Sequence, residues 1–235
     1  MKLIFLFFAA LILLPGLPWV ATIAAAGQVC SGQNLYAKKA KDADSGRVYS
    51  PDGRKWVTAR RAYVPNSDEE VQMRISVHLG KKQFTTELNG FRAEILWSPD
   101  SSAFAVNETE GGGGIGQRTY VFYVSSEGLR KLDASMSVEK AFGQPVKCEM
   151  PVPPNTAILT WLTPNRVLVG AEVINVSLCE HMGTFQTYQV SLPDLKIITV
   201  LSQSETKARF GEYLGCELRG ADDSSAAAWQ REKAK

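Results

Sequence analysis

Alternation of apolar and polar residues is the clearest pattern in the chain. In residues 71–77, VQMRISV, every second side chain is apolar. A period of two places these side chains on one face of a β-strand, and it predicts a strand that is buried on that face alone. The pattern ends at Gly80 and apolar residues return over residues 83–88, which predicts an antiparallel hairpin.

Three proline-containing turns divide the chain into similar stretches. In each stretch an aromatic residue precedes the proline by two or three positions, and an apolar strand follows the turn. The aromatic and proline residues are Tyr49 and Pro51, Trp97 and Pro99, and Trp161 and Pro164. Proline presets the dihedral angle that the first corner of a turn needs. We expect these six residues to be the structural anchors of a repeat, with the three rings buried between neighbouring sheets.

A hairpin follows each of these turns. Residues 120–132 form the second copy and residues 185–200 the third, with turn residues at Ser125–Gly128 and Pro193–Asp194. Together with the strand pair at each proline turn, every copy predicts an antiparallel meander of four strands. The fold class is therefore all-β.

Four strands per repeat, at a spacing of roughly 40–50 residues, are typical of β-propeller blades. Three copies are fewer than a closed propeller uses, so the sequence predicts a small or incomplete propeller. Either residues 34–39 and 210–218 combine into a degenerate fourth blade, or the array stays open. An ordinary β-sandwich built from similar hairpins is the alternative.

The stretch 97–106, WSPDSSAFAV, resembles the turn motif of TolB-like β-propeller repeats, whose blades carry a Trp-Ser-Pro-Asp-Gly turn between two strands. Residues 49–53, YSPDG, match it with tyrosine in place of tryptophan, and residues 161–165, WLTPN, depart from it by one inserted residue and by asparagine for aspartate. The resemblance implies the propeller fold. It implies little about activity, because such blades occur in envelope scaffolds and as gating domains of peptidases.

The N-terminus has the features of a secretory signal peptide. A single lysine precedes an apolar run over residues 3–14, and small residues follow at 24–27. We expect residues 1–26 to be removed, which places the protein outside the cytoplasm, secreted or periplasmic. Pro15 and Pro18 argue against a continuous spanning helix, although an uncleaved N-terminal membrane anchor is the alternative. After cleavage the sequence predicts no integral membrane span.

The exported part is expected to form one domain over residues 27–220, with a polar tail over residues 221–235 that is flexible or helical. Lysine and arginine number 26 against 24 acidic residues, so the overall charge gives no reason to expect nucleic acid as a partner.

Four cysteines lie in the exported part, an even number that predicts two disulfides in an oxidising compartment. They are Cys30, Cys148, Cys179 and Cys216. Three pairings are open; we favour Cys179 with Cys216, which leaves Cys30 with Cys148.

A glycine-rich segment is the most distinctive stretch outside the strands. Its residues are Gly111, Gly112, Gly113, Gly114 and Gly116, with Arg118 close behind. A phosphate-binding loop would need lysine and serine or threonine after the last glycine, and glutamine and arginine stand there instead. We therefore expect the tip of a hairpin that serves as an interaction loop. Asn107 and Asn175 begin glycosylation acceptor patterns.

Candidate catalytic groups are few. Cys179, Glu180 and His181 are consecutive, whereas catalytic cysteine–histidine pairs are normally distant in sequence. Glu108 and Glu110 flank the glycine-rich segment and could act as a carboxylate pair only if they face each other across a cleft. No catalytic, metal-binding or cofactor-binding residue is predicted. The sequence favours a non-catalytic protein that binds another protein or an envelope component through its loops; a small secreted hydrolase using loop carboxylates is the alternative.

Overall fold

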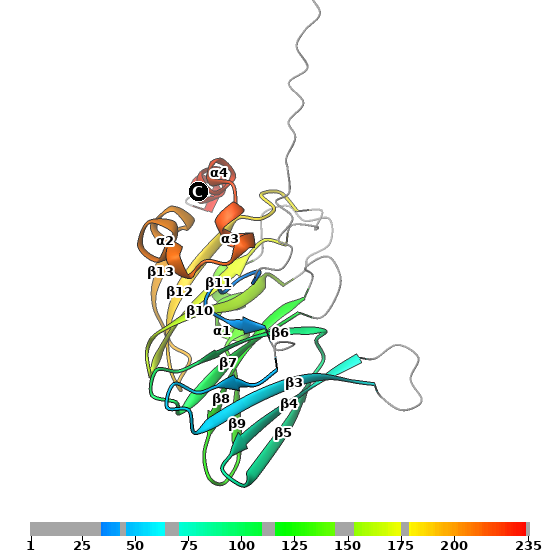
Figure 1. The fold of residues 1–235 in the computed structure, drawn as a ribbon. Coiled ribbons are helices and arrows are strands. Elements are labelled where there is room, and N and C mark those ends of the chain that lie inside the picture. The colour runs from blue at the N-terminus through cyan, green and yellow to red at the C-terminus, as the bar shows by residue number, and fades with distance from the viewer. Residues whose placement is uncertain are drawn as a thin grey trace, which may run out of the picture.

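The computed structural model describes residues 34–42, 46–63, 71–109, 116–143, 153–174 and 179–233. Their strands form three antiparallel sheets, and short helices gather near the C-terminus (Figure 1). The prediction of an all-β chain is confirmed.

Each sheet contains a four-stranded meander in sequence order. The first sheet has the order β2-β3-β4-β5 and consists of β2 (Val48–Tyr49), β3 (Lys55–Tyr63), β4 (Val71–Leu79) and β5 (Lys82–Leu88). The second has the order β1-β6-β7-β8-β9 and consists of β1 (Lys41–Asp42), β6 (Arg92–Trp97), β7 (Ala103–Thr109), β8 (Gln117–Val124) and β9 (Leu129–Asp133). The third has the order β10-β11-β12-β13 and consists of β10 (Asn155–Thr163), β11 (Arg166–Glu172), β12 (Phe185–Ser191) and β13 (Ile197–Leu201).

The helices lie in two places in the chain. The first, α1 (Ser135–Phe142), links the second and third sheets. The others follow the third sheet and are α2 (Gln203–Phe210), η2 (Gly211–Tyr213), α3 (Cys216–Gly220) and α4 (Asp223–Lys233). Among the described residues, none of these helices has the length and apolar character to cross a membrane.

Two apolar cores join the three sheets. One core lies between the first and second sheets, where Val57 and Ile75 meet Phe104 and Phe122, which stack with ring centroids 5.1 Å apart. The other joins the second and third sheets and includes Val121, Ile158, Val169, Tyr188 and Phe142 of α1. The second sheet is therefore covered on both faces.

The two ends of this stack differ in chemistry. On β4 of the first sheet, Met73, Ile75 and Val77 are buried, whereas Arg74 is exposed and His78 is half-buried on the opposite face. The predicted half-buried strand is confirmed, and its polar face forms one end of the stack.

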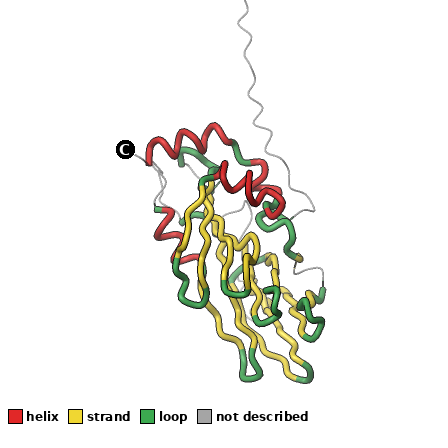
Figure 2. The backbone as a smooth tube through the Cα atoms, turned by 90° about the vertical axis from the view of Figure 1, so that its left-hand side faces the viewer, coloured by secondary structure: helices red, strands yellow, loops and turns green. Residues whose placement is uncertain are grey.

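At the other end, the outer face of the third sheet is apolar. Leu159, Leu168 and Phe185 pack there against Leu214 and Leu218 of the C-terminal segment. The C-terminal segment, with its short helices, thus shields the apolar outer face of the third sheet from water (Figure 2).

Residues 34–39 lie against residues 210–218, the two segments that were expected to combine into a fourth blade. Ala37 and Leu214 form an isolated antiparallel bridge, and the Gly215 amide donates to the Tyr36 carbonyl at 2.6 Å. A Cβ atom at Gly215 would lie 2.3 Å from the Leu35 oxygen, so only glycine fits this close approach. These segments do not form a fourth four-stranded sheet, because the C-terminal one is largely helical.

The first two proline turns share one structure. In residues 50–55 and 98–103 the leading serine amide donates to the carbonyl five positions later, at 2.9 and 2.8 Å. The serine hydroxyl donates to the aspartate two positions later, at 2.6 and 2.7 Å. Gly53 and Ser101 occupy the same left-handed position, with φ of 69° and 62°.

The third proline turn is different. At Pro164 a two-residue connection joins β10 to β11, because Thr163 pairs directly with Arg166. A related pattern occurs in residues 191–196 between β12 and β13. The Ser191 amide again donates to the carbonyl five positions later, but its hydroxyl donates to Asp194, three positions later, and Leu195 takes the left-handed φ of 55°. Turns of this kind therefore occur at two places in a meander: between the first and second strands, as at Pro51 and Pro99, and between the third and fourth strands, as at residues 191–196.

Several predictions concern residues outside the described ranges, among them the signal peptide, Cys30, Cys148, Asn175 and Gly111–Gly114. Cys179 and Cys216 are both disulfide-bonded, so neither is a free thiol. The pairing of Cys179 with Cys216 stays a prediction.

The segment expected as a flexible or helical tail contains α4. Its Trp229 is completely buried, and the indole lies against Phe142 with ring centroids 5.0 Å apart. The tail therefore belongs to the core that joins the second and third sheets.

Candidate functional site

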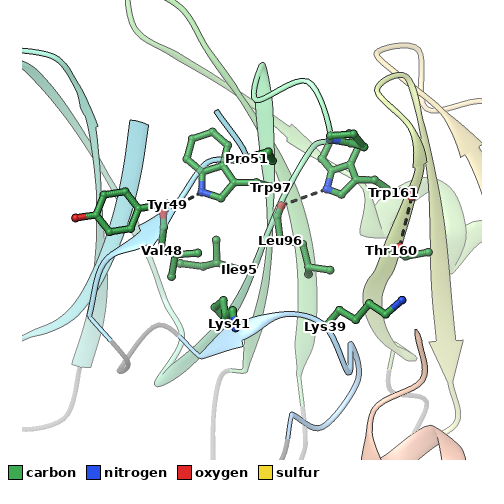
Figure 3. Close-up of a pocket in the computed structure, with 11 residues that line it drawn as sticks. Lys39, Lys41, Val48, Tyr49, Pro51, Ile95, Leu96, Trp97, Thr160 and Trp161 are labelled. Atoms are coloured by element: carbon green, nitrogen blue, oxygen red, sulfur yellow. Dashed lines mark hydrogen bonds between the residues drawn. The ribbon is translucent and has the colours of Figure 1, made fainter. Parts of the chain in front are cut away.

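A pocket of about 320 Å³ opens where the first strands of the three meanders come together (Figure 3). Strands β2, β6 and β10 line it, and the segment that leads into β1 closes one side. The lining residues are Lys39, Lys41, Val48, Tyr49, Pro51, Ile95, Leu96, Trp97, Pro99, Thr160 and Trp161. Five of the six predicted repeat anchors are in this set; only Pro164 is not.

The two tryptophans connect neighbouring sheets through equivalent hydrogen bonds. Trp97 donates its indole N–H to the Val48 carbonyl at 3.0 Å, and Trp161 donates to the Leu96 carbonyl at 3.2 Å. The accepting residues are at equivalent positions. Val48 directly precedes Tyr49, the aromatic anchor of the first sheet, and Leu96 directly precedes Trp97, the anchor of the second sheet. Figure 3 shows both bonds running side by side along the pocket. The expectation of inter-sheet anchors holds for these two residues, which are half-buried.

The same expectation is wrong for Tyr49. Its side chain is 53% exposed, and its ring lies beside Trp56 of the same sheet, 6.1 Å between centroids. The physical reason is its position: in the described chain no four-stranded sheet precedes the first one, so Tyr49 has no neighbouring carbonyl to reach. Its ring is left at the mouth of the pocket.

The charge of the pocket is basic. Among the described residues, its lining contains two lysines and no carboxylate. Lys39 is already engaged, because its ammonium lies 2.8 Å from Glu212 Oε2 and 4.0 Å from the centroid of Tyr213, and the hydrogen bond to Glu212 raises the pKa of Lys39. Lys41 is exposed on β1, beside Ile95 in the strand pairing. Lys41 is therefore the lining lysine that could pair with an anionic group in the pocket.

The lining has the chemistry of a binding site. Among the described lining residues there is no cysteine, histidine, serine or carboxylate, and the ionisable or hydroxyl side chains are those of Lys39, Lys41, Tyr49 and Thr160. No group of three or more metal-ligating side chains occurs in the part of the chain that the structure describes. Aromatic and aliphatic walls with one available cation suit a ligand that combines an apolar body with a negative charge.

Glu94 on β6 holds the lysine-bearing segment in place. Its carboxylate accepts backbone N–H groups of Leu35, Tyr36 and Ala37 at 2.7, 3.2 and 3.0 Å. Burial raises the pKa of Glu94, while these hydrogen bonds oppose the shift. This role could not be predicted from the sequence, because a glutamate on a half-buried strand has no local feature that shows what it contacts.

Asn107 belongs to the same polar cluster and cannot be a glycosylation acceptor as folded. It is 2% exposed, donates to the Ile158 carbonyl at 2.9 Å and accepts from the Ile158 amide at 2.7 Å. The acceptor pattern at Asn107 therefore does not mark an accessible site in the folded chain, because the side chain joins β7 to β10.

A second buried cluster joins the N-terminal segment to the third sheet. The Tyr36 hydroxyl donates to Glu172 Oε2 at 2.9 Å and accepts from Asn155 at 3.0 Å. Burial raises the pKa of Glu172 to about 8, and the negative charge of Glu217 adds to the shift. The Glu172 carboxyl is therefore largely protonated at neutral pH.

The candidate catalytic residues that the structure describes do not line this pocket. Glu108 is 1% exposed on β7, Glu110 lies outside the described residues, and Glu180 and His181 sit in the loop before β12. Gly116 and Arg118 stand at the start of β8, so the glycine-rich segment does connect β7 to β8. Glu108 pairs in register with Arg118, which makes it part of the sheet.

No protein-family model matches this chain, and the search of curated proteins found no match either.

Proposed function

We propose that this protein is a secreted or periplasmic, non-catalytic binding protein, and that it takes an acidic, partly apolar segment of a protein partner or envelope component in the pocket between its three sheets. We propose further that the three meanders are blades of an open propeller related to TolB-like repeats. The observation that carries the binding proposal is the convergence of five repeat anchors on one basic, aromatic-lined pocket.

Three features support an open array. Each indole of the second and third sheets bonds to the sheet before it, whereas the ring of Tyr49 has no such partner sheet. The outer face of the first sheet is polar, and that of the third sheet is covered by the C-terminal segment. Both ends of the stack can therefore exist without further blades.

The ligand chemistry follows from the lining. Tyr49 offers a wide exposed ring at the mouth, Trp97 and Trp161 offer half-buried rings, and Lys41 offers a positive charge. Aromatic rings of this kind provide large contact areas at low cost in conformational entropy. A peptide segment with a carboxylate next to an aromatic or aliphatic side chain would satisfy both parts of the pocket.

Calorimetric titration with synthetic peptides tests this proposal. The panel holds one aromatic core in acidic, amidated and basic versions, and the acidic version is expected to bind most tightly. Lys41→Glu and Tyr49→Ala should each weaken that binding by roughly tenfold, which corresponds to about 1.4 kcal/mol.

The matched control is Lys140→Glu, an exposed lysine on α1 that does not line the pocket. It should leave binding unchanged. Equal binding of all three peptide versions, or no effect of Lys41→Glu, would contradict the proposal.

A further inference from the structure

The last strand of each sheet, β5, β9 or β13, lies at an edge of that sheet. These three edge strands differ in how well their side chains protect them from pairing with another chain. Strand β5 carries Lys82 and Glu87, and β9 carries Arg130, Lys131 and Asp133. Charged side chains on an edge strand discourage pairing with another chain. Strand β13, with the sequence IITVL, contains no charged residue, no proline and no glycine, and its pairing with β12 is interrupted by a β-bulge at Ile198.

Strand β13 is also apolar on its surface. Ile198 is 45% exposed and Val200 is 50% exposed, which places two of the most exposed large apolar residues of the described chain on one edge. Among the described residues β13 pairs with β12 alone, and it is the last strand of the third sheet (Figure 1). Its free backbone N–H and C=O groups are therefore available to another strand.

We propose that β13 is a homodimerisation edge, on which β13 of a second copy of this chain adds as an antiparallel strand. The sequence of β13 is complementary to itself in this arrangement. A two-fold axis at Thr199 places Ile198 opposite Val200 of the second copy, and Ile197 opposite its Leu201. Directly opposite residues in an antiparallel pair lie on the same face, so each exposed apolar side chain meets another one.

The flanking residues permit the same register. Lys196 would face Ser202 of the second copy, so the pairing brings no like charges together. Two Thr199 residues would face each other at the centre, where threonine pairs are favourable across strands. An interface of this kind is isologous and closes as a dimer, which leaves no further free β13 edge.

Sedimentation velocity of the purified, disulfide-intact chain tests the dimer. A five-residue strand pair is a small interface, so we expect a dissociation constant on the order of 100 µM. Val200→Lys should weaken the dimer at least tenfold without affecting the fold, because the side chain is exposed. Met136→Lys is the matched control: it replaces an exposed apolar residue on α1, 64% exposed, and should leave association unchanged.

Cross-linking tests the register independently. Thr199→Cys should form an intermolecular disulfide under mild oxidation, since the two-fold axis places this residue opposite itself. Thr85→Cys, on the charged edge strand β5, should not do so. A monomer at every concentration, a dimer that persists in Val200→Lys, or equal cross-linking of the two cysteine variants would overturn the proposal. None of these outcomes depends on the pocket between the sheets.

Discussion

Single side chains connect the sheets of this protein through polar as well as apolar contacts. Trp97 and Trp161 each combine a half-buried ring with one hydrogen bond to the preceding sheet. Glu94 and Asn107 join the N-terminal segment and β10 to the second sheet. Because a buried polar group that loses its partner destabilises the fold, these residues should be sensitive to small chemical changes.

Trp97 separates the contribution of the hydrogen bond from that of the ring. Trp97→Phe keeps an aromatic ring and leaves the Val48 carbonyl without its donor, so we expect a loss of about 1 kcal/mol in the free energy of unfolding. Trp97→Ala also removes the packing and should cost about 2–4 kcal/mol. Tyr49→Ala, at the equivalent but exposed position, should change stability by less than about 0.5 kcal/mol. Urea unfolding measures all three, and equal effects at positions 49 and 97 would contradict the assigned roles.

Glu172 should make stability depend on pH. Its pKa in the folded protein is raised to about 8, above the ordinary value of 4.5, so the folded state keeps a proton that the unfolded chain releases between these values. Stability is therefore highest below about pH 4.5 as far as this group is concerned, and it falls until about pH 8.

Urea unfolding at about pH 5 and about pH 8 tests this dependence. The Glu172→Gln variant, which resembles the protonated acid, should show a smaller loss of stability between the two pH values than the original chain. Glu127→Gln, an exposed residue in the turn after β8, is the control and should not change the difference. An unchanged difference in Glu172→Gln would refute the assignment.

At the scale of elements, the strands follow the local patterns of the sequence. The C-terminal helices and the residues between them shield an apolar sheet face from solvent. The outer face of the third sheet is apolar, and residues of the C-terminal segment pack on it. Helix α4 contributes one large side chain, Trp229, to the core that joins the second and third sheets. This indole holds α4 to the domain together with Gln203 and Lys207 of α2, which both donate to Asp223 Oδ1 at 2.8 Å.

Removal of that indole should be costly. Trp229→Ala is expected to lower the free energy of unfolding by about 3–5 kcal/mol, because the side chain is fully buried against Phe142. Thermal unfolding followed by circular dichroism measures the effect. Met136→Ala, an exposed residue of α1, should be close to neutral, and a neutral Trp229→Ala would show that α4 is not required for the core.

At the scale of the whole molecule, the stack has a covered centre and two unlike ends. The second sheet is buried on both faces, whereas the first sheet presents a polar face to solvent. Amide hydrogen exchange should follow this arrangement, since exchange is slowest where opening a segment exposes the most apolar surface.

We therefore expect β7 and β8 to exchange most slowly and β5 to exchange fastest among the strands of the first two sheets. Exchange followed by mass spectrometry of proteolytic fragments measures this order. Protection of β5 equal to that of β7 would indicate that something covers the outer face of the first sheet in solution.

Local patterns in the sequence were sufficient for much of the fold. The period-two pattern of β4, the hairpins and the turns at Pro51 and Pro99 depend on neighbouring residues, so they follow from chemistry that is visible along the chain. Gly53 and Ser101 are an example. They share a left-handed backbone conformation, and both turns need a residue that tolerates it. The meander arrangement and the candidate anchors followed from the same local signals.

Contacts between distant residues decided the rest. The exposure of Tyr49 depends on which sheet precedes it, the roles of Glu94 and Glu172 depend on a segment more than fifty residues away in sequence, and the meeting of Ala37 with Leu214 joins the two ends of the domain. The sequence by itself determined strands, turns and repeat positions, since each depends on local geometry. Only the tertiary structure decided which of those positions surround a pocket and which faces of the sheets are covered, because burial depends on what packs from elsewhere in the chain.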